Sequence, residues 1–185
     1  DEPSPEAMLI GAQERARETP RKADVTPAPL TMLENGNLVT LDMPRIEAVV
    51  RAACEGLADY VTPESILAET VKNLYDGVPL DEVYKASILA ARTLIEKDPD
   101  YTFATARLLL HTIFKEAVGR EVPTAERAQS YADYFPLFIR KGVDNELLDE
   151  RLLQYDLAAL GRALKAERDL QFDYLGLQTL YDRYF

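Results

Sequence analysis

A single strong turn signal near the start of the chain, followed by helical periodicity to its end, constrains the fold most. Residues 30–33 and 38–41 form two strand-like runs, and Glu34-Asn35-Gly36-Asn37 lies between them. An Asn-Gly pair in this position is the strongest short-range signal for a β-hairpin, because both residues adopt positive φ readily. The sequence therefore predicts a hairpin over residues 30–41 and a mainly α fold after it.

Apolar residues at helical spacing, together with capping and breaking residues, predict four helices after the hairpin. In the second of these, Ile66, Thr70 and Val71 are predicted to face inward with their apolar neighbours. Proline follows a capping threonine at the start of this helix, which is the preferred position for proline in a helix. The helices are predicted to open at Asp42, Thr62-Pro63, Leu80 and Tyr101, with breaks at Gly56, residues 75–79, Asp98-Pro99-Asp100 and Gly119.

The charged stretch at residues 119–123 resembles a boundary between two subdomains. Beyond it we expect helices at about 124–140 and 145–164, the first of them ending at Gly142. The predicted organisation is a disordered lead over residues 1–29, with a helical turn around residues 7–17. A domain at 30–119 and a helical domain at 120–185 follow.

The last part of the chain, residues 169–185, is rich in aromatic residues and amphipathic. Leu177, Leu180, Tyr181 and Tyr184 follow the i, i+3, i+4, i+7 spacing of one helix face. An apolar face at this position needs a surface to cover it. We therefore expect the chain to be the front of a longer protein whose chemistry lies beyond Phe185.

The composition excludes several classes of partner. A net charge of −11 disfavours binding to nucleic acid and to anionic membranes. No apolar run reaches the length of a membrane span, and no signal-peptide pattern is present. The single cysteine, Cys54, rules out an internal disulfide framework and fits a reducing cytoplasm.

Catalytic and metal-binding residues are not predicted from the sequence. Cys54 lies beside the apolar stripe of a predicted helix, where a packing role is expected. His111 has no second histidine or other cysteine with which to form a dyad or a metal site. The chain contains neither Glu-x-x-His pairs nor the glycine-rich phosphate-binding motifs, so its many carboxylates are interpreted as solvated surface.

One pattern does indicate a ligand. A short hairpin with Asn35-Gly36 at its tip, followed by four helices, can hold a nucleotide if basic side chains line the hairpin. Arg45, in the first turn of the following helix, is placed to contact phosphate, although a simple surface arginine is the alternative interpretation.

Four segments of the sequence resemble the large subunit of class I ribonucleoside-diphosphate reductase. The first three are similar to its ATP-cone module, and the fourth to the segment that leads into a ten-stranded catalytic barrel, which is absent here. The resemblance runs from about Leu30 to Phe185. It rests on residues 41–46 with 53–57, residues 74–77, residues 100–108 and residues 169–185.

This resemblance implies a hairpin plus four-helix cone that binds ATP as activator or dATP as inhibitor. It implies that the whole protein reduces ribonucleotides with cysteine radical chemistry, started by a small metal-containing subunit, and forms a large-subunit homodimer through downstream domains. The catalytic cysteines cannot lie in this chain, whose only cysteine is Cys54. The chain itself is therefore expected to be catalytically inactive.

The phosphate site departs from the family pattern, in which a lysine-arginine pair precedes the turn. Here Leu33 and Glu34 occupy these positions. Arg45 matches a basic position and Val83 an apolar position beside the base, so the candidate nucleotide-binding residues are Asn35, Gly36, Arg45 and Val83. Three further positions also depart from the family pattern. A usual histidine is Tyr84 here, a threonine-like residue is Leu80, and a basic residue is Glu116.

We therefore expect a cone that keeps its fold but binds ATP and dATP poorly or not at all. One alternative is a functional cone with a rearranged phosphate site that uses Arg45, Lys85 or Lys115. Another is a non-catalytic, all-helical interaction module. A cone-bearing transcriptional repressor is disfavoured, because it needs four zinc-binding cysteines and a positive surface.

Overall fold

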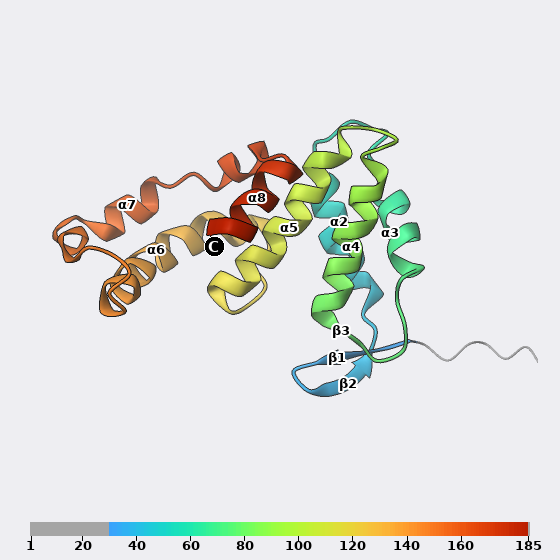
Figure 1. Ribbon diagram of the computed structural model, residues 1–185, viewed down its shortest axis with the longest axis horizontal. Helices are drawn as coiled ribbons and strands as arrows, with labels where there is room; N and C mark the ends of the chain where they lie inside the picture. The colour runs from blue at the N-terminus through green and yellow to red at the C-terminus, as the bar shows by residue number, and fades with distance from the viewer. Residues whose placement is uncertain (1–29, 185) are drawn as a thin grey trace, which may run out of the picture.

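The computed structural model describes residues 30–184, so the expectations for residues 1–29 lie outside the described part of the chain. The described part is mainly helical and carries one small sheet near its beginning (Figure 1). In chain order its elements are β1 (Thr31–Glu34), β2 (Asn37–Thr40), α2 (Met43–Cys54), α3 (Pro63–Val71), β3 (Val78–Pro79), α4 (Leu80–Leu94), α5 (Tyr101–Val118), η1 (Thr124–Glu126), α6 (Arg127–Asp144), η2 (Glu150–Gln154), α7 (Leu157–Ala163), η3 (Ala166–Gln171) and α8 (Tyr174–Tyr184).

The predicted hairpin is confirmed. Strands β1 and β2 are antiparallel, with Glu34 opposite Asn37, and the turn residues Asn35 and Gly36 have φ values of 51° and 79°. Both values lie in the left-handed region that this tight turn requires. A third short strand, β3, was not predicted; it pairs in parallel with β1, so the strand order is β2-β1-β3.

Helices α2 to α5 form a four-helix bundle in which each helix packs against two of the others. The predicted caps are present: the Asp42 side chain accepts a hydrogen bond from the Arg45 backbone N–H at 3.0 Å, and Thr62 caps α3 with Pro63 in its first turn. Helix α5 ends as predicted at Gly119, which has a φ of 78°. Such caps satisfy backbone groups that would otherwise lack partners at the helix ends.

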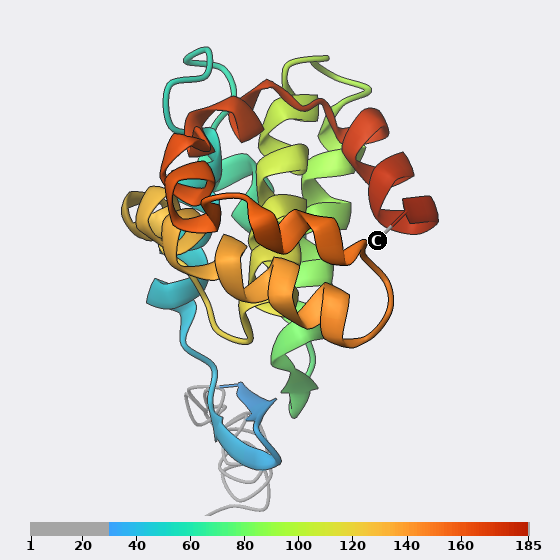
Figure 2. The same cartoon turned by 90° about the vertical axis from the view of Figure 1, so that its left-hand side faces the viewer.

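The bundle core contains the inward-facing residues predicted from helical spacing, with one exception. Val71 is 46% exposed, because α3 ends at this residue and its last turn lies at the edge of the bundle. The residues with at most 1% exposure in the bundle helices include Ile46, Val50, Ile66, Thr70, Val83, Ser87, Ala91, Ala104, Thr105 and Ala106. The hairpin and the start of α2 project from one end of the bundle that this core holds together (Figure 2).

The second half of the described chain differs from its prediction. Helix α6 does not end at Gly142 but runs on to Asp144; Gly142 is buried within the helix, and the side chain of Leu148 packs directly over it. No continuous helix spans 145–164. The side chains of Asp149 and Asp156 each accept a backbone hydrogen bond that starts a new short element, η2 and α7 respectively.

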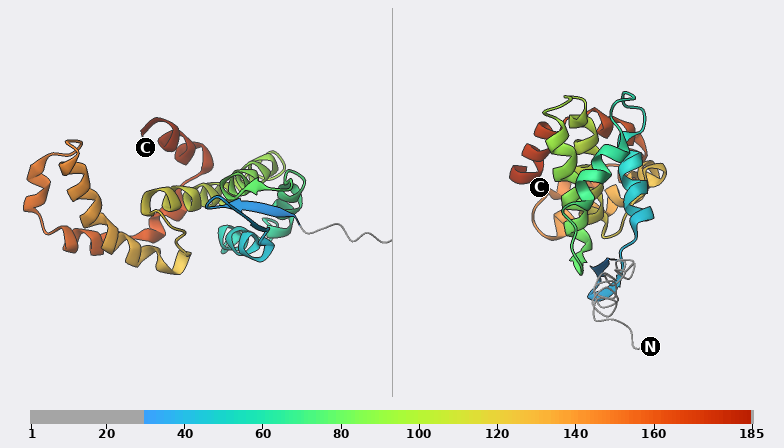
Figure 3. Two further views of the ribbon diagram at one scale, coloured as in Figure 1. Left: turned by 90° about the horizontal axis from the view of Figure 1, so that it is seen from below. Right: turned by 90° about the vertical axis from the view of Figure 1, so that its right-hand side faces the viewer.

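Helix α8 folds back onto the bundle, where it packs against α5 (Figure 1). The predicted apolar face is covered in part by the bundle itself: Leu177 is 2% exposed and Tyr181 packs against the core, although Tyr184 is 75% exposed. The molecule is elongated, with the four-helix bundle and its sheet in one half and α6–α7 at the opposite end (Figure 3). Within residues 30–184, no helix is both long and apolar enough to span a membrane.

Candidate functional site

The start of α2 lies beside the hairpin, and Arg45 is at the centre of this junction. Its guanidinium donates hydrogen bonds from Nη1 to Glu34 at 2.8 Å, from Nε to Glu121 at 3.2 Å and from Nη2 to Glu121 at 2.6 Å. The contact with Glu121 is bidentate, the geometry in which arginine binds a carboxylate most strongly. The hydroxyl of Tyr84 also donates to Glu121, at 2.7 Å. We call Glu34, Arg45, Tyr84 and Glu121 the Arg45 cluster.

The protonation states in the Arg45 cluster follow from this geometry. Burial alone favours the neutral form of Glu121, but hydrogen bonds from Arg45 and Tyr84 outweigh it and lower the pKa of this carboxyl. The hydrogen bond to Glu121 raises the pKa of Arg45 above its usual value. Burial, followed by the hydrogen bond to Glu121, raises the pKa of Tyr84. In the cluster the charged Arg45 therefore faces two carboxylates, and no positive charge of the cluster remains unpaired.

Replacing Glu121 by glutamine is expected to lower the free energy of unfolding by about 2 kcal/mol at pH 7, because it removes charge-assisted hydrogen bonds from a half-buried arginine. A carboxyl whose pKa is lowered on folding stabilises the protein above its ordinary pKa of about 4.3 and loses that contribution as the pH falls through its folded value. Urea unfolding at pH 7 and at pH 3 should therefore show the difference between Glu121→Gln and the unsubstituted chain shrinking in acid.

The control for this experiment is Glu126→Gln, whose carboxylate makes an exposed ion pair with Arg120. This substitution should change the free energy of unfolding by no more than about 0.5 kcal/mol at either pH. A Glu121→Gln effect equal to that of the control, or one that grows in acid, would contradict the assigned contacts.

The four candidate nucleotide-binding residues are only partly brought together. Asn35 and Gly36 form the exposed hairpin tip, and Arg45 contacts the neighbouring Glu34. Val83 is 0% exposed and lies inside the bundle. Its side chain thus contributes to the core beneath the junction.

The remaining basic candidates have other environments. Lys115 forms an ion pair with Asp81, and its Nζ lies 5.7 Å from the centre of the Tyr84 ring. Lys85 is exposed on α4 and lines a separate hollow between α3 and α4 with Glu69 and Glu82.

Glu116, in the last turns of α5, belongs to a different contact. Both of its carboxylate oxygens lie 2.9 Å from the hydroxyl of Tyr181 on α8, which donates to them. This residue therefore joins α8 to the bundle, a contact that was not predicted from the sequence.

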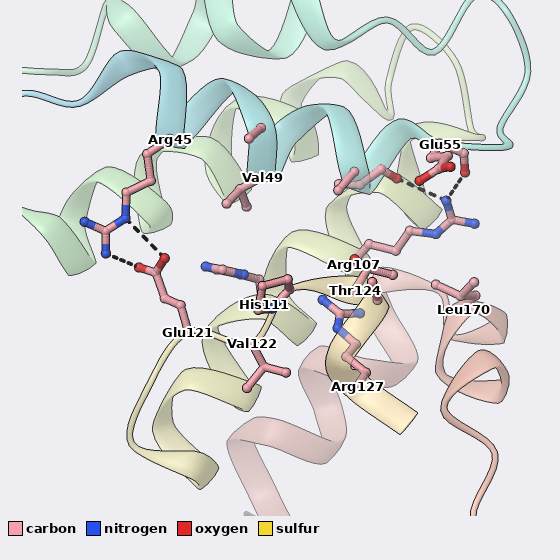
Figure 4. A pocket seen from close by; sticks show the side chains of 15 residues that line it. Arg45, Val49, Glu55, Arg107, His111, Glu121, Val122, Thr124, Arg127 and Leu170 are labelled. Atoms are coloured by element: carbon pink, nitrogen blue, oxygen red, sulfur yellow. Dashed lines mark hydrogen bonds and ion pairs between the residues drawn. The ribbon is translucent and has the colours of Figure 1, made fainter. Parts of the chain in front are cut away.

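Next to the Arg45 cluster lies a cavity of about 480 Å³ between α2, α5 and the segment that joins α5 to α6 (Figure 4). Arg45 and Glu121 form one end of it, and His111 lies between that end and two further arginines, Arg107 and Arg127. Arg107 and His111 are four residues apart on α5, but the other charged wall residues join them only through long-range folding, so the group was not identified from the sequence. Among residues 30–184, no group of three or more His, Cys, Asp or Glu side chains could hold a metal ion.

Comparison with known proteins identifies several reductase subunits as relatives. The chain is 37% identical over 152 residues to the ribonucleoside-diphosphate reductase subunit alpha of Chlamydia trachomatis, covering 82% of this chain and 14% of that protein. It is 30% identical over 151 residues to the subunit of the same name in Helicobacter pylori, covering 81% of this chain and 18% of that protein.

A third relative is the ribonucleoside-diphosphate reductase 1 subunit alpha of Escherichia coli, at 26% identity over 157 residues, which is 84% of this chain and 20% of that protein. The chain thus spans a fifth or less of the length of these three relatives. No protein-family model matches the sequence.

Proposed function

This chain is a homologue of the ribonucleoside-diphosphate reductase alpha subunits over most of its length, and from this relationship we propose that it is a regulatory and structural region of such a subunit. In this proposal the whole protein reduces ribonucleoside diphosphates to deoxyribonucleotides by radical chemistry. The radical comes from a small-subunit partner, and the large subunits pair through other domains. The setting proposed for this activity is the cytoplasm.

The chemical step is proposed to take place outside this chain. Its only cysteine, Cys54, is 8% exposed at the end of α2. Burial raises the pKa of this thiol to about 11, so it stays protonated at neutral pH. A buried, protonated thiol is suited to packing and not to redox chemistry.

We further propose that the hairpin and bundle form a cone whose phosphate site is degenerate. The observation that carries this proposal is the Arg45 cluster. Leu33 and Glu34 stand where the family pattern has a lysine-arginine pair, and Arg45 is already bound by two carboxylates. A phosphate group would have to displace Glu34 or Glu121 to reach this guanidinium.

Electrostatic magnitudes favour the loss of binding. Replacing arginine by glutamate at a phosphate contact changes the local charge by two units. Each pair of unit charges about 4 Å apart is worth about 4 kcal/mol at an effective dielectric constant of 20, before solvation is counted. If only a quarter of this remains, the change at Glu34 weakens binding more than tenfold.

Calorimetric titration of the chain with dATP and with ATP tests this proposal. We expect no saturable binding at micromolar nucleotide, because the site presents carboxylates to the phosphates. A micromolar dissociation constant for either nucleotide would contradict it and would favour the alternative of a rearranged site that uses Arg45, Lys85 or Lys115.

A second role, as a contact surface, is supported by a specific feature of α6 and the segments that follow it. Large apolar side chains are unusually exposed there: Leu137 at 57%, Phe138 at 55%, Leu147 at 79% and Tyr155 at 63%. Apolar groups exposed together typically mark interaction sites. We propose that this surface packs against other parts of the protein or its partners.

A further inference from the structure

The cavity beside α2 has two arginines at the end opposite to the Arg45 cluster. Arg107 projects from the middle of α5, and Arg127 from the first residue of α6 (Figure 4). They approach the cavity from two different helices, α5 and α6. Two positive groups facing one space repel each other unless an anion lies between them.

Neither guanidinium has a carboxylate partner among residues 30–184. Arg127 is 7% exposed, and its buried Nε has no hydrogen-bond partner in this range. Its guanidinium carbon lies 4.9 Å from the centre of the Phe114 ring. Asp169 acts on Arg127 through space, but its carboxylate accepts a 2.7 Å hydrogen bond from Tyr131.

Only one nitrogen atom of the Arg107 guanidinium has hydrogen-bond partners among the described residues. Its Nη1 donates to the backbone carbonyls of Ala53 at 3.2 Å and Glu55 at 2.6 Å, which caps the C-terminal end of α2. Its Nε is buried without a partner among the described residues, and so is Nε2 of His111. Arg107, His111 and Arg127 thus line one cavity, and each carries a buried nitrogen atom without a partner among the described residues.

An unpaired charge or donor inside a protein is costly, and proteins normally pair such groups. Burial lowers the pKa of Arg127, and the charge of Arg107 lowers it further. The energetic strain falls on this end of the cavity, where Glu55 and Asp169 act on the two guanidinium groups only through space and form no ion pair with them. An anion held there would remove that strain.

Apart from Glu55, beside Arg107, and Thr124, the rest of the cavity wall is apolar and built mostly from small residues. Its volume of about 480 Å³ lies in the range of small-molecule sites and far exceeds the space of a single ion. The apolar wall residues are Ala48, Val49, Ala52, Val122, Pro123, Ala125 and Leu170. Such a wall suits the body of an organic molecule.

We propose that this cavity binds an organic oxyanion, a carboxylate or a phosphate monoester, with its charged group between Arg107 and Arg127 and its apolar body against α2. The charged end of this site lies opposite to Arg45, the residue of the proposed nucleotide site that borders the same cavity. Its charge comes from arginines that the degenerate phosphate site does not use.

The test measures binding of phenyl phosphate and of benzoate to the whole chain by calorimetry and by the shift in thermal unfolding. Inorganic phosphate serves as the probe without an apolar body. Saturable binding of phenyl phosphate or benzoate that is tighter than that of inorganic phosphate is the expected result. The stronger of the two organic probes identifies the class of oxyanion.

The key variant is Arg127→Met, which is expected to weaken probe binding at least tenfold. Because it removes an unpaired buried charge, its unfolding temperature without ligand should not fall. The matched control, Arg162→Met, changes an exposed arginine on α7 and should bind as the unsubstituted chain does.

A second variant keeps the test independent of Arg127. Ala52 is exposed at the cavity wall, so Ala52→Phe should block the cavity without disturbing the core. Loss of binding in this variant supports the proposal. Binding unchanged in Arg127→Met and Ala52→Phe, or no binding of either organic probe at millimolar concentration, would overturn it.

Discussion

Replacing Leu177 by alanine is expected to lower the free energy of unfolding by about 3 kcal/mol, because it opens a cavity in a fully packed contact. Leu177 is 2% exposed between α8 and the bundle. Hydrogen bonds hold the helix on either side of it. The backbone N–H of Tyr174 donates to the Thr102 hydroxyl at 3.0 Å, and the Tyr181 hydroxyl donates to Glu116.

Leu175→Ala is the matched control, because Leu175 is 76% exposed on the same helix. Its effect should stay within about 0.5 kcal/mol. Both variants can be compared by urea unfolding followed by circular dichroism. Equal effects in the two variants would show that α8 does not pack on the bundle as described.

The part of the fold that could be predicted from the sequence depends on local signals. The hairpin follows from Asn35-Gly36, α3 from Thr62-Pro63, and the end of α5 from Gly119. In each case the turn or cap is decided by a few neighbouring residues. The structure confirms all three.

The part that could not be predicted depends on distant contacts. Gly142 has the sequence character of a helix end, yet the helix continues through it, and the glycine instead leaves the space that the Leu148 side chain fills. Strand β3 has two residues and forms only because β1 lies beside it. No periodicity marks either feature.

The same distinction holds for the candidate site. Arg45 was identified because it lies in the first turn after the hairpin. Glu121 was not, since it lies 76 residues away in the chain and reaches Arg45 only when α5 returns toward the hairpin. The sequence showed that the cations before the turn are missing, but only the structure shows a carboxylate bound to the one that remains.

Restoring the missing cations is expected to restore nucleotide binding. The double substitution Leu33→Lys with Glu34→Arg adds three units of positive charge at the hairpin and releases Arg45 from one carboxylate. At about 1 kcal/mol for each unit, a quarter of the unscreened value, dATP should bind about a hundredfold more tightly. Leu33 is 40% exposed, so lysine is tolerated there.

The control must carry the same net charge in another place. Val71→Lys with Glu64→Arg adds three units on α3, where both side chains are largely exposed. If the net charge of the chain governed binding, this control would gain as much affinity as the hairpin variant. If local charge at the hairpin governs binding, the control should show no gain in affinity for dATP.

The proposal that the phosphate site at the hairpin is degenerate is therefore tested most directly by calorimetric dATP titrations on three proteins. These are the chain, the hairpin variant and the α3 control. All three carry Arg127→Met, so that the arginine cavity contributes nothing. We expect saturable dATP binding by the hairpin variant alone. Micromolar binding by the chain without hairpin substitutions, or a folded hairpin variant that binds no better than the α3 control, would contradict it.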